Sequence, residues 1–296
     1  MKYIAILLFG LCAIKATAQQ DPLYSQYFNN PMLINPAFAG SIERLYAGLA
    51  YRSQWAGIDG GPTTFNFNAH MPLTNQNLAV GAIAMQDKIG DQKNTTFSGS
   101  VAYRIKLKSS TFSFGMNAGM VRFSTDLNAV RVLNPDPLFA PYSESKFNTG
   151  VGVLLKSDAF AVGLSVPQLL PNTVSQGGQS IKVSGQTFYL FGSYNYFFNE
   201  HIVFKPSVLL RGTQGIKPSI DINATMTWDQ LYSAGIFARN FNTYGILLQG
   251  IFNDIRIGYV FEIPGKGSAL NYNTHELSLA IGLKALPGHY RTATGF

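Results

Sequence analysis

The side chains that most often perform catalysis or hold metals are few and widely spaced in this sequence. No two histidines lie at the short spacing of metal ligands. A hydrolase would need His70 to meet a serine and an acid in space, but Asp221, Glu262 and Glu276 are all distant from it in sequence. We therefore predict no catalysis, no metal and no cofactor, with a hydrolase as the alternative that only geometry can decide. The four histidines are His70, His201, His275 and His289.

The elements that would position these side chains are strands of about ten residues with two-residue periodicity. In the last one, Leu277, Leu279 and Ile281 alternate with Glu276 and Ser278. One apolar face and one small or polar face is typical of a half-buried strand. We count fourteen such segments, at about 45–55, 63–71, 77–87, 95–106, 110–122, 147–155, 159–166, 186–198, 201–211, 218–228, 230–239, 243–252, 254–263 and 274–286.

The connections between these segments alternate in length. One set is short, such as 107–109, 229 and 253, and the other is mostly longer, such as 123–146 and 167–185. Short turns at one end and long loops at the other are typical of a bacterial outer-membrane barrel, whose turns face the periplasm. The fold class predicted is all-β: a transmembrane barrel of about fourteen antiparallel strands. A soluble β-sandwich would carry more charge on its outward faces.

Composition supports this class and excludes two others. Only 12% of residues are charged and 46% are hydrophobic, which is the opposite of a disordered chain. After the N-terminus, no stretch contains the ~18 consecutive apolar residues of a spanning helix. The positive charges form no cluster that would suggest nucleic-acid binding.

Several ionisable residues lie on the polar face of the predicted strands. An Arg or Lys turned toward lipid at the membrane midplane costs about 2–4 kcal/mol, so we expect these side chains to face the lumen or a rim. They could hold another segment, line a pore, or simply neutralise one another. The positive residues are Arg52, Arg104, Lys106, Lys205, Arg211, Arg256 and Lys284, and the negative ones are Asp221, Glu262 and Glu276.

The N-terminus has the pattern of an export signal: a basic start, an apolar run, and the small-residue site Ala16-Thr17-Ala18. We expect residues 1–18 to be the signal peptide and residues 19–44 to form a separate segment before the barrel at 45–286 and a periplasmic tail at 287–296. The segment 19–44 contains prolines that oppose regular pairing, yet it is too apolar for a free tail. It is therefore predicted to plug the barrel or to order on a periplasmic partner.

Short motifs in this region resemble one family. The runs Gln26–Pro31 (QYFNNP), Ile34–Gly40 (INPAFAG), Tyr51–Trp55 (YRSQW), Gly60–Thr64 (GGPTT) and Asp87–Gly90 (DKIG) occur in the order seen in PorP/SprF-type proteins. The resemblance covers the first ~105 residues, and one departure is the tail after the last strand. The residues that the resemblance and composition mark for plugging or partner binding are Tyr27, Phe28, Pro31, Asn35, Pro36, Phe38 and Gly40.

The resemblance implies a non-catalytic outer-membrane component of the type IX secretion and gliding machinery of Bacteroidota. Its implied partners are periplasmic ring proteins or the C-terminal domains of secreted surface adhesins, which the family helps to secrete or anchor. The alternative function is a transporter for small hydrophobic compounds. Of the two longest loops, 167–185 is Gln/Gly/Ser-rich and predicted to be mobile, whereas 123–146 is predicted to make an outer contact through Leu133, Leu138, Phe139 and Tyr142.

Overall fold

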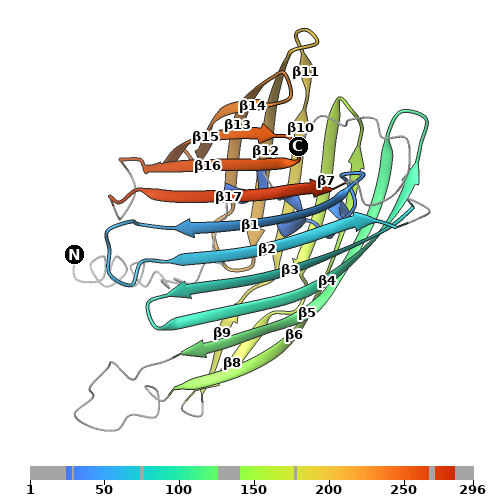
Figure 1. Ribbon diagram of the computed structural model, residues 1–296. Helices are drawn as coiled ribbons and strands as arrows, with labels where there is room; N and C mark the ends of the chain where they lie inside the picture. Colours follow the sequence, from blue (N-terminus) through green and yellow to red (C-terminus); the bar gives the residue numbers. More distant parts are fainter. Residues whose placement is uncertain are drawn as a thin grey trace, which may run out of the picture.

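The computed structural model describes residues 25–28, 30–73, 77–125, 141–176, 179–266 and 271–283. Within them, fourteen strands form one closed antiparallel barrel (Figure 1). The order follows the chain, and two pairings close the ring, β1 with β17 and β10 with β12. The strands are β1 (Leu45–Ser53), β2 (Thr63–Pro72), β3 (Leu78–Ile89), β4 (Gln92–Lys106), β5 (Thr111–Thr125), β6 (Tyr142–Lys156), β7 (Phe160–Gln168), β10 (Thr187–Tyr194), β12 (Ile202–Thr213), β13 (Ser219–Trp228), β14 (Tyr232–Arg239), β15 (Thr243–Phe252), β16 (Ile255–Pro264) and β17 (Thr274–Leu283).

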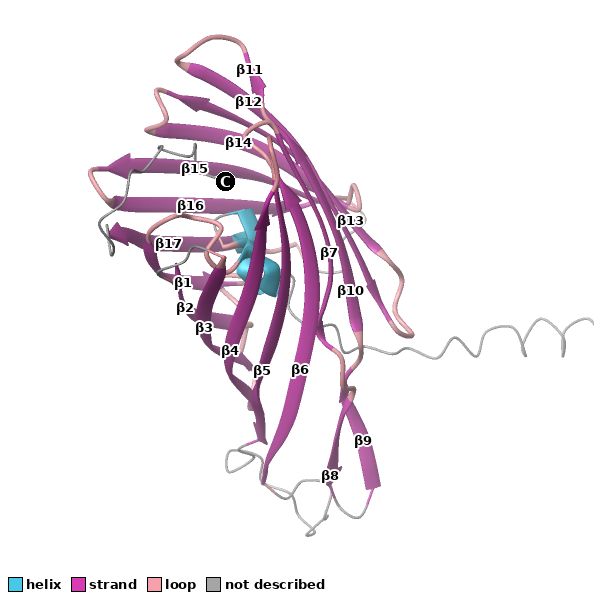
Figure 2. Ribbon diagram, turned by 90° about the vertical axis from the view of Figure 1, so that its right-hand side faces the viewer, coloured by secondary structure: helices cyan, strands magenta, loops and turns pink. Residues whose placement is uncertain are grey.

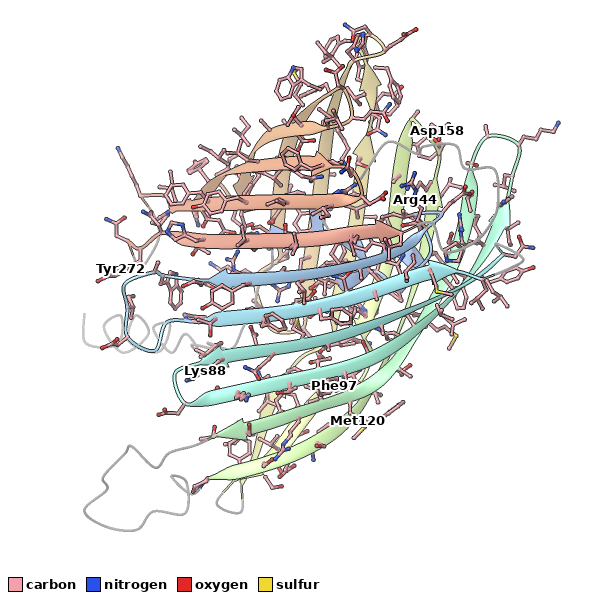
Figure 3. All side chains as sticks on the ribbon, viewed as in Figure 1. Arg44, Lys88, Phe97, Met120, Asp158 and Tyr272 are labelled. Atoms are coloured by element: carbon pink, nitrogen blue, oxygen red, sulfur yellow. The ribbon has the colours of Figure 1, made fainter. Side chains whose placement is uncertain are left out.

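The predicted alternation is present in the wall of the barrel. On β17, Leu277 and Leu279 face outward and are exposed, whereas Glu276 and Ala280 face inward and are buried. Phe97 of β4 and Met120 of β5 likewise project from the outer surface (Figure 3). An apolar exterior and a small or polar interior are what a strand between lipid and a lumen requires. No helix among the described residues is long and apolar enough to cross a membrane.

The fourteen strands match the fourteen predicted segments, and the differences lie at the loops. The predicted connection at 88–94 is a tight turn, because β3 continues to Ile89 and β4 begins at Gln92. β6 also begins early, at Tyr142, which shortens the long predicted loop on that side. Cross-strand pairs continue beyond the expected ends in both places, and such pairing stabilises extra residues.

The loop at 167–185 corrects another prediction. It contains a hairpin of β8 (Asn172–Gln176) and β9 (Gln179–Ser184), where a mobile loop was expected. Val174 is buried against Val121 and Phe123 of β5, with Tyr142 packed beside them. The β-branched residues of the β8–β9 hairpin, Val174, Ile181 and Val183, provide its apolar face. The Gln/Gly/Ser-rich composition of the loop gave no indication of this face.

The two ends of the barrel differ, and we name them by their connections. The turn end carries residues 107–110, 157–159, 229–231 and 253–254. The loop end carries the connections after β1, β5, β7 and β16. A two-residue strand, β11 (Tyr196–Phe197), extends the β10–β12 connection at the turn end. Inside the barrel lie three 3-10 turns, η1 (Ser25–Phe28), η2 (Pro31–Leu33) and η3 (Pro36–Phe38), drawn in cyan in Figure 2.

Candidate functional site: the occupied barrel lumen

The N-terminal segment (residues 25–28 and 30–44) occupies the lumen. Pro31 and Pro36 begin η2 and η3, where a fixed φ is suited to the first turn and no N–H is required. Tyr27, Met32 and Phe38 are each at most 2% exposed, so the segment forms the centre of the molecule's core. The prolines that oppose strand pairing thus shape a compact insert that the barrel surrounds.

Two cross-strand ion pairs hold the loop-end half of the lumen. Arg52 lies opposite Glu276 in the β1–β17 register, and its Nη1 is 3.1 Å from Glu276 Oε2. Asp221 lies opposite Arg239 in the β13–β14 register, and Arg239 Nε is 2.9 Å from Asp221 Oδ2. Directly opposed charges of unlike sign stabilise a strand pair.

Glu262 of β16 joins these two pairs into one network. It accepts two hydrogen bonds from Arg52, at 2.6 Å from Nη1 and 2.9 Å from Nη2, and Arg239 Nη1 lies 3.7 Å away. Such a bidentate, charge-assisted contact is among the strongest in proteins. The network, Arg52, Asp221, Arg239, Glu262 and Glu276, is buried throughout.

The N-terminal segment is bonded to this network through Ser25. The Ser25 hydroxyl donates to Glu262 Oε1 and accepts from Arg239 Nη2 at 3.0 Å. Next to it, the Tyr27 ring packs on Phe28, whose ring lies 5.7 Å from that of Phe237 on β14. Burial, with Asp221 and Glu262 nearby, raises the pKa of the Tyr27 hydroxyl well above its ordinary value. The start of the segment is thus fixed in the loop-end half of the lumen.

Glycines of the barrel wall form a close seat for the middle of the segment. A Cβ at Gly115 of β5 would lie 2.3 Å from the backbone nitrogen of Ala37, and a Cβ at Gly152 of β6 would lie 2.1 Å from Asn35 Oδ1. A Cβ at Gly81 of β3 would similarly meet the Met32 sulfur at 2.6 Å. Side chains at these three places would occupy the space of the segment, so their absence lets the segment approach the wall.

Asn35 makes the specific polar contacts of this seat. Its Nδ2 donates to Val153 O at 3.0 Å, and its Oδ1 accepts from Ala37 N at 2.9 Å, which caps η3. Ser165 Oγ of β7 donates to the Ile34 carbonyl at 2.6 Å. These contacts bond the segment to β6 and β7, on the opposite side of the lumen from Glu262.

The end of the segment leaves the lumen at the turn end. Gly40 has a left-handed φ of 69°, and its N–H donates to His70 Nδ1 at 3.2 Å. The His70 ring stacks on Tyr46 at 5.2 Å between centroids, so its described contacts are with the segment and with β1. Arg44, labelled in Figure 3, then pairs with Asp254 at 3.2 Å before β1 begins. The segment therefore crosses the lumen from the loop-end half to the turn end.

The structure places the sequence-predicted residues as follows. Tyr27, Phe28, Pro31, Asn35, Pro36, Phe38 and Gly40 lie together in the lumen with Arg52, Asp221, Glu262 and Glu276. Arg104 lies 3.9 Å from Glu43, whereas Lys205, Arg211 and Arg256 face other parts of the lumen. Lys106 is exposed at the end of β4, and Lys284, Leu133, Leu138 and Phe139 lie outside the described residues.

Sequence reasoning missed two members of the network, Arg239 and Ser25. Arg239 ends a segment whose two faces are both apolar, so the sequence did not show whether its side chain faces the lumen or the lipid. It lies two residues after Phe237 and therefore on the same face of the strand, and both side chains are buried. This shared face is the signal that was available. Ser25 has no distinguishing neighbour in sequence. Among the described residues, no group of three or more His, Cys, Asp or Glu side chains is arranged to hold a metal ion.

Comparisons with known proteins give the fold and the family. The Ralstonia pickettii toluene transporter TbuX aligns with 12% identity and a TM-score of 0.51, covering 86% of this chain and 92% of that one. The CymD monoaromatic hydrocarbon channel aligns with 11% identity and a TM-score of 0.54, covering 90% and 94%. At these identities the likeness concerns the barrel fold alone. A search of curated proteins finds no match.

The family model described as type IX secretion system membrane protein PorP/SprF matches residues 16–281, nearly the whole chain. The match extends well past the motifs near the N-terminus and includes every strand of the barrel except the last two residues of β17. The chain therefore belongs to the PorP/SprF family, as an outer-membrane β-barrel component of type IX secretion.

Proposed function

We propose that this barrel acts in type IX secretion without catalysis, through contacts with periplasmic ring proteins or with the C-terminal domains of secreted adhesins. The observation that carries the proposal is the occupied lumen. The N-terminal segment is bonded to Glu262 and Arg239 on one side and to Val153 and Ser165 on the other. A lumen filled by the chain's own buried core supports a scaffold for partner proteins over an open passage.

The size of the cavity beside the segment argues against the transporter alternative. A cavity of about 120 Å³ lies beside the segment, lined by apolar residues that include Ile83, Met85, Phe123 and Tyr189. It is smaller than the ~150 Å³ cavity that is known to hold benzene. Entry of a monoaromatic compound into this cavity would therefore require the segment to move. Uptake of labelled toluene by cells that contain the protein, above the level of cells that lack it, would favour transport.

The test is recovery of partners from the native membrane. The tagged full-length protein is extracted in mild detergent, purified, and its companions are identified by mass spectrometry. We expect ring proteins of the secretion system or a large surface adhesin, and recovery of neither would contradict the proposal.

Two glycine variants then show whether the N-terminal segment takes part. Gly115→Val places atoms where Ala37 lies, whereas a Cβ at Gly99 of β4 meets nothing within 4 Å. Loss of ring proteins in Gly115→Val but not in Gly99→Val would make the segment their docking element. An adhesin retained in both variants would instead indicate that the loop end of the barrel, and not the N-terminal segment, binds it.

A further inference from the structure

A second cavity, which we call the turn-end pocket, lies between the N-terminal segment and the wall formed by β6, β7, β10 and β12. Its volume is about 50 Å³. Its walls include Phe28 and Phe38 of the segment, and Phe160 and Phe191 of the barrel. Lys156 is the last residue of β6, and the turn at 157–159 forms part of the lining, so the pocket opens at the turn end.

Two ammonium groups line this pocket. Lys156 Nζ donates to the Ser41 carbonyl at 3.4 Å. Lys205, by contrast, forms no ion pair and no hydrogen bond with the described residues, although it faces a largely apolar wall. Lys205 is partly buried. A partly buried cation without an anion is unfavourable, and a bound carboxylate would relieve this.

The charges around the pocket are predominantly positive. Asp158 is the one carboxylate among the lining residues, and it sits on the turn at the rim (Figure 3). Arg104 and Arg256 also face the turn-end half of the lumen, with Glu43 3.9 Å from Arg104. In the loop-end network, three carboxylates face two arginines, so the excess of positive charge is confined to the turn end.

These features define the chemistry of an occupant. The pocket, at about 50 Å³, admits a small anionic group alone, and the partly exposed Phe160 ring at its turn-end edge favours an apolar or aromatic neighbour that stays outside the pocket. Its lining residues face the lumen and not the lipid, so the ligand must come from the aqueous compartment at the turn end. That compartment is the periplasm in barrels of this kind.

We propose that the turn-end pocket binds a carboxylate carried next to an aromatic side chain on a peptide segment of a periplasmic partner. The proposal deepens the function given above and rests on it. Lys205 supplies the unpaired charge, Lys156 the second ammonium group, and Phe160 at the edge of the pocket the apolar contact.

The test uses a peptide of that chemistry with the full-length protein in lipid nanodiscs. The probe is acetyl-Gly-Ser-Gly-(4-fluoro-Phe) with a free C-terminal carboxylate, and the comparison is the same peptide with a C-terminal amide. Binding is measured by fluorine NMR of the peptide. We expect the acid to bind at least tenfold more tightly than the amide, because hydrogen bonds between ions are the stronger ones.

Two lysine variants locate the binding. Lys205→Met should weaken binding of the acid at least tenfold. Lys182→Met should leave it unchanged, because Lys182 is exposed on β9, in the loop-end hairpin, and bonded to Gln214 at 3.3 Å, at the opposite end of the barrel from the pocket. Equal binding of acid and amide to the wild-type protein, unchanged binding in Lys205→Met, or displacement by equimolar inorganic phosphate would each overturn the proposal.

The same variants separate this proposal from the function on which it rests. If the peptide fails to bind but the wild-type protein still recovers secretion proteins from the membrane, only the pocket assignment is wrong. If the wild-type protein recovers none, the proposed function itself is wrong. The acid–amide comparison needs no variant, so it decides the pocket even if Lys205→Met folds poorly.

Discussion

Replacing Asn35 by alanine should loosen the N-terminal segment while leaving the barrel closed. The Asn35 side chain is 1% exposed and serves both partners at once: Nδ2 donates to Val153 O at 3.0 Å, and Oδ1 accepts from Ala37 N at 2.9 Å. The strand ladder between β6 and β7 does not depend on it. The substitution therefore acts on the docking of the segment and not on the wall.

The magnitude follows from these two bonds. Loss of the bond to Val153 costs about 0.5–1.5 kcal/mol, and a buried Ala37 N–H left without an acceptor costs about 1–3 kcal/mol. Together they lower the free energy of segment opening by about 2–4 kcal/mol. Since 1.4 kcal/mol is a factor of ten, the segment should open on the order of 30 to 1,000 times more often.

Hydrogen exchange measures this opening directly. The reporters are amides bonded within the segment, such as Ala39 N to Pro36 O at 3.1 Å and Ser41 N to Phe38 O at 2.9 Å. Their exchange should accelerate by the factor above, while amides of β13 and β14 keep their wild-type rates. The control is Asn148→Ala, which removes a bond of similar kind, Nδ2 to Leu170 O at 2.8 Å, that does not involve the segment. Acceleration below threefold in Asn35→Ala, or equal acceleration in Asn148→Ala, would refute the reasoning.

Three further predictions concern the same lumen. Glu262→Gln should destabilise the barrel by about 1.5–3 kcal/mol in urea unfolding, because it removes the charge-assisted bonds to Arg52 while Glu276 and Asp221 still pair with the two arginines. Arg44→Met, which removes the partly exposed pair with Asp254, should change stability by less than ~1 kcal/mol. In proteins that carry Ala39→Cys, Gly115→Val should make the thiol reactive toward maleimide, whereas Gly99→Val should leave it protected, since Ala39 is fully buried. Equal labelling in both would count against the glycine seat. Because the Tyr27 pKa is raised, docking should be complete below the ordinary tyrosine pKa near ~10 and weaken as pH rises above it, and Tyr27→Phe should abolish this weakening; a dye on Ile42→Cys reports the release, and an identical pH response in both proteins would contradict the assignment.

The strands were predictable from sequence because successive side chains of each strand alternate between two environments, the lipid and the lumen. Leu277, Leu279 and Ile281 contact one medium and Glu276, Ser278 and Ala280 the other, so two-residue periodicity suffices. The β8–β9 hairpin was not predictable in the same way, because its buried Val174 packs on β5, far away in sequence. The Gln/Gly/Ser content of residues 167–185 therefore led to the prediction of a mobile loop.

The lumen site could be predicted only in part. The parity of Arg52, Asp221, Glu262 and Glu276 indicates that they face inward, but their partners depend on strand register and barrel curvature, which no local pattern contains. The bond between Ser25 and Glu262 joins residues 237 positions apart. The glycine seat is equally hidden, since Gly115 and Gly152 differ from other wall glycines only in what lies opposite them.

The position of the N-terminal segment has a consequence for how the protein is assembled. The segment is the first described part of the chain, yet Ser25 is fixed by residues of β14 and β16, which are among the last strands to be synthesised. Contacts of such long range are formed slowly, because a large loop must close before they contribute. The β1–β17 seam that closes the wall does not depend on these contacts, because its register begins at Leu45, after the segment. Docking of the segment is therefore a late step of assembly, and variants with a weakened seat should accumulate as closed barrels whose segment is not yet docked.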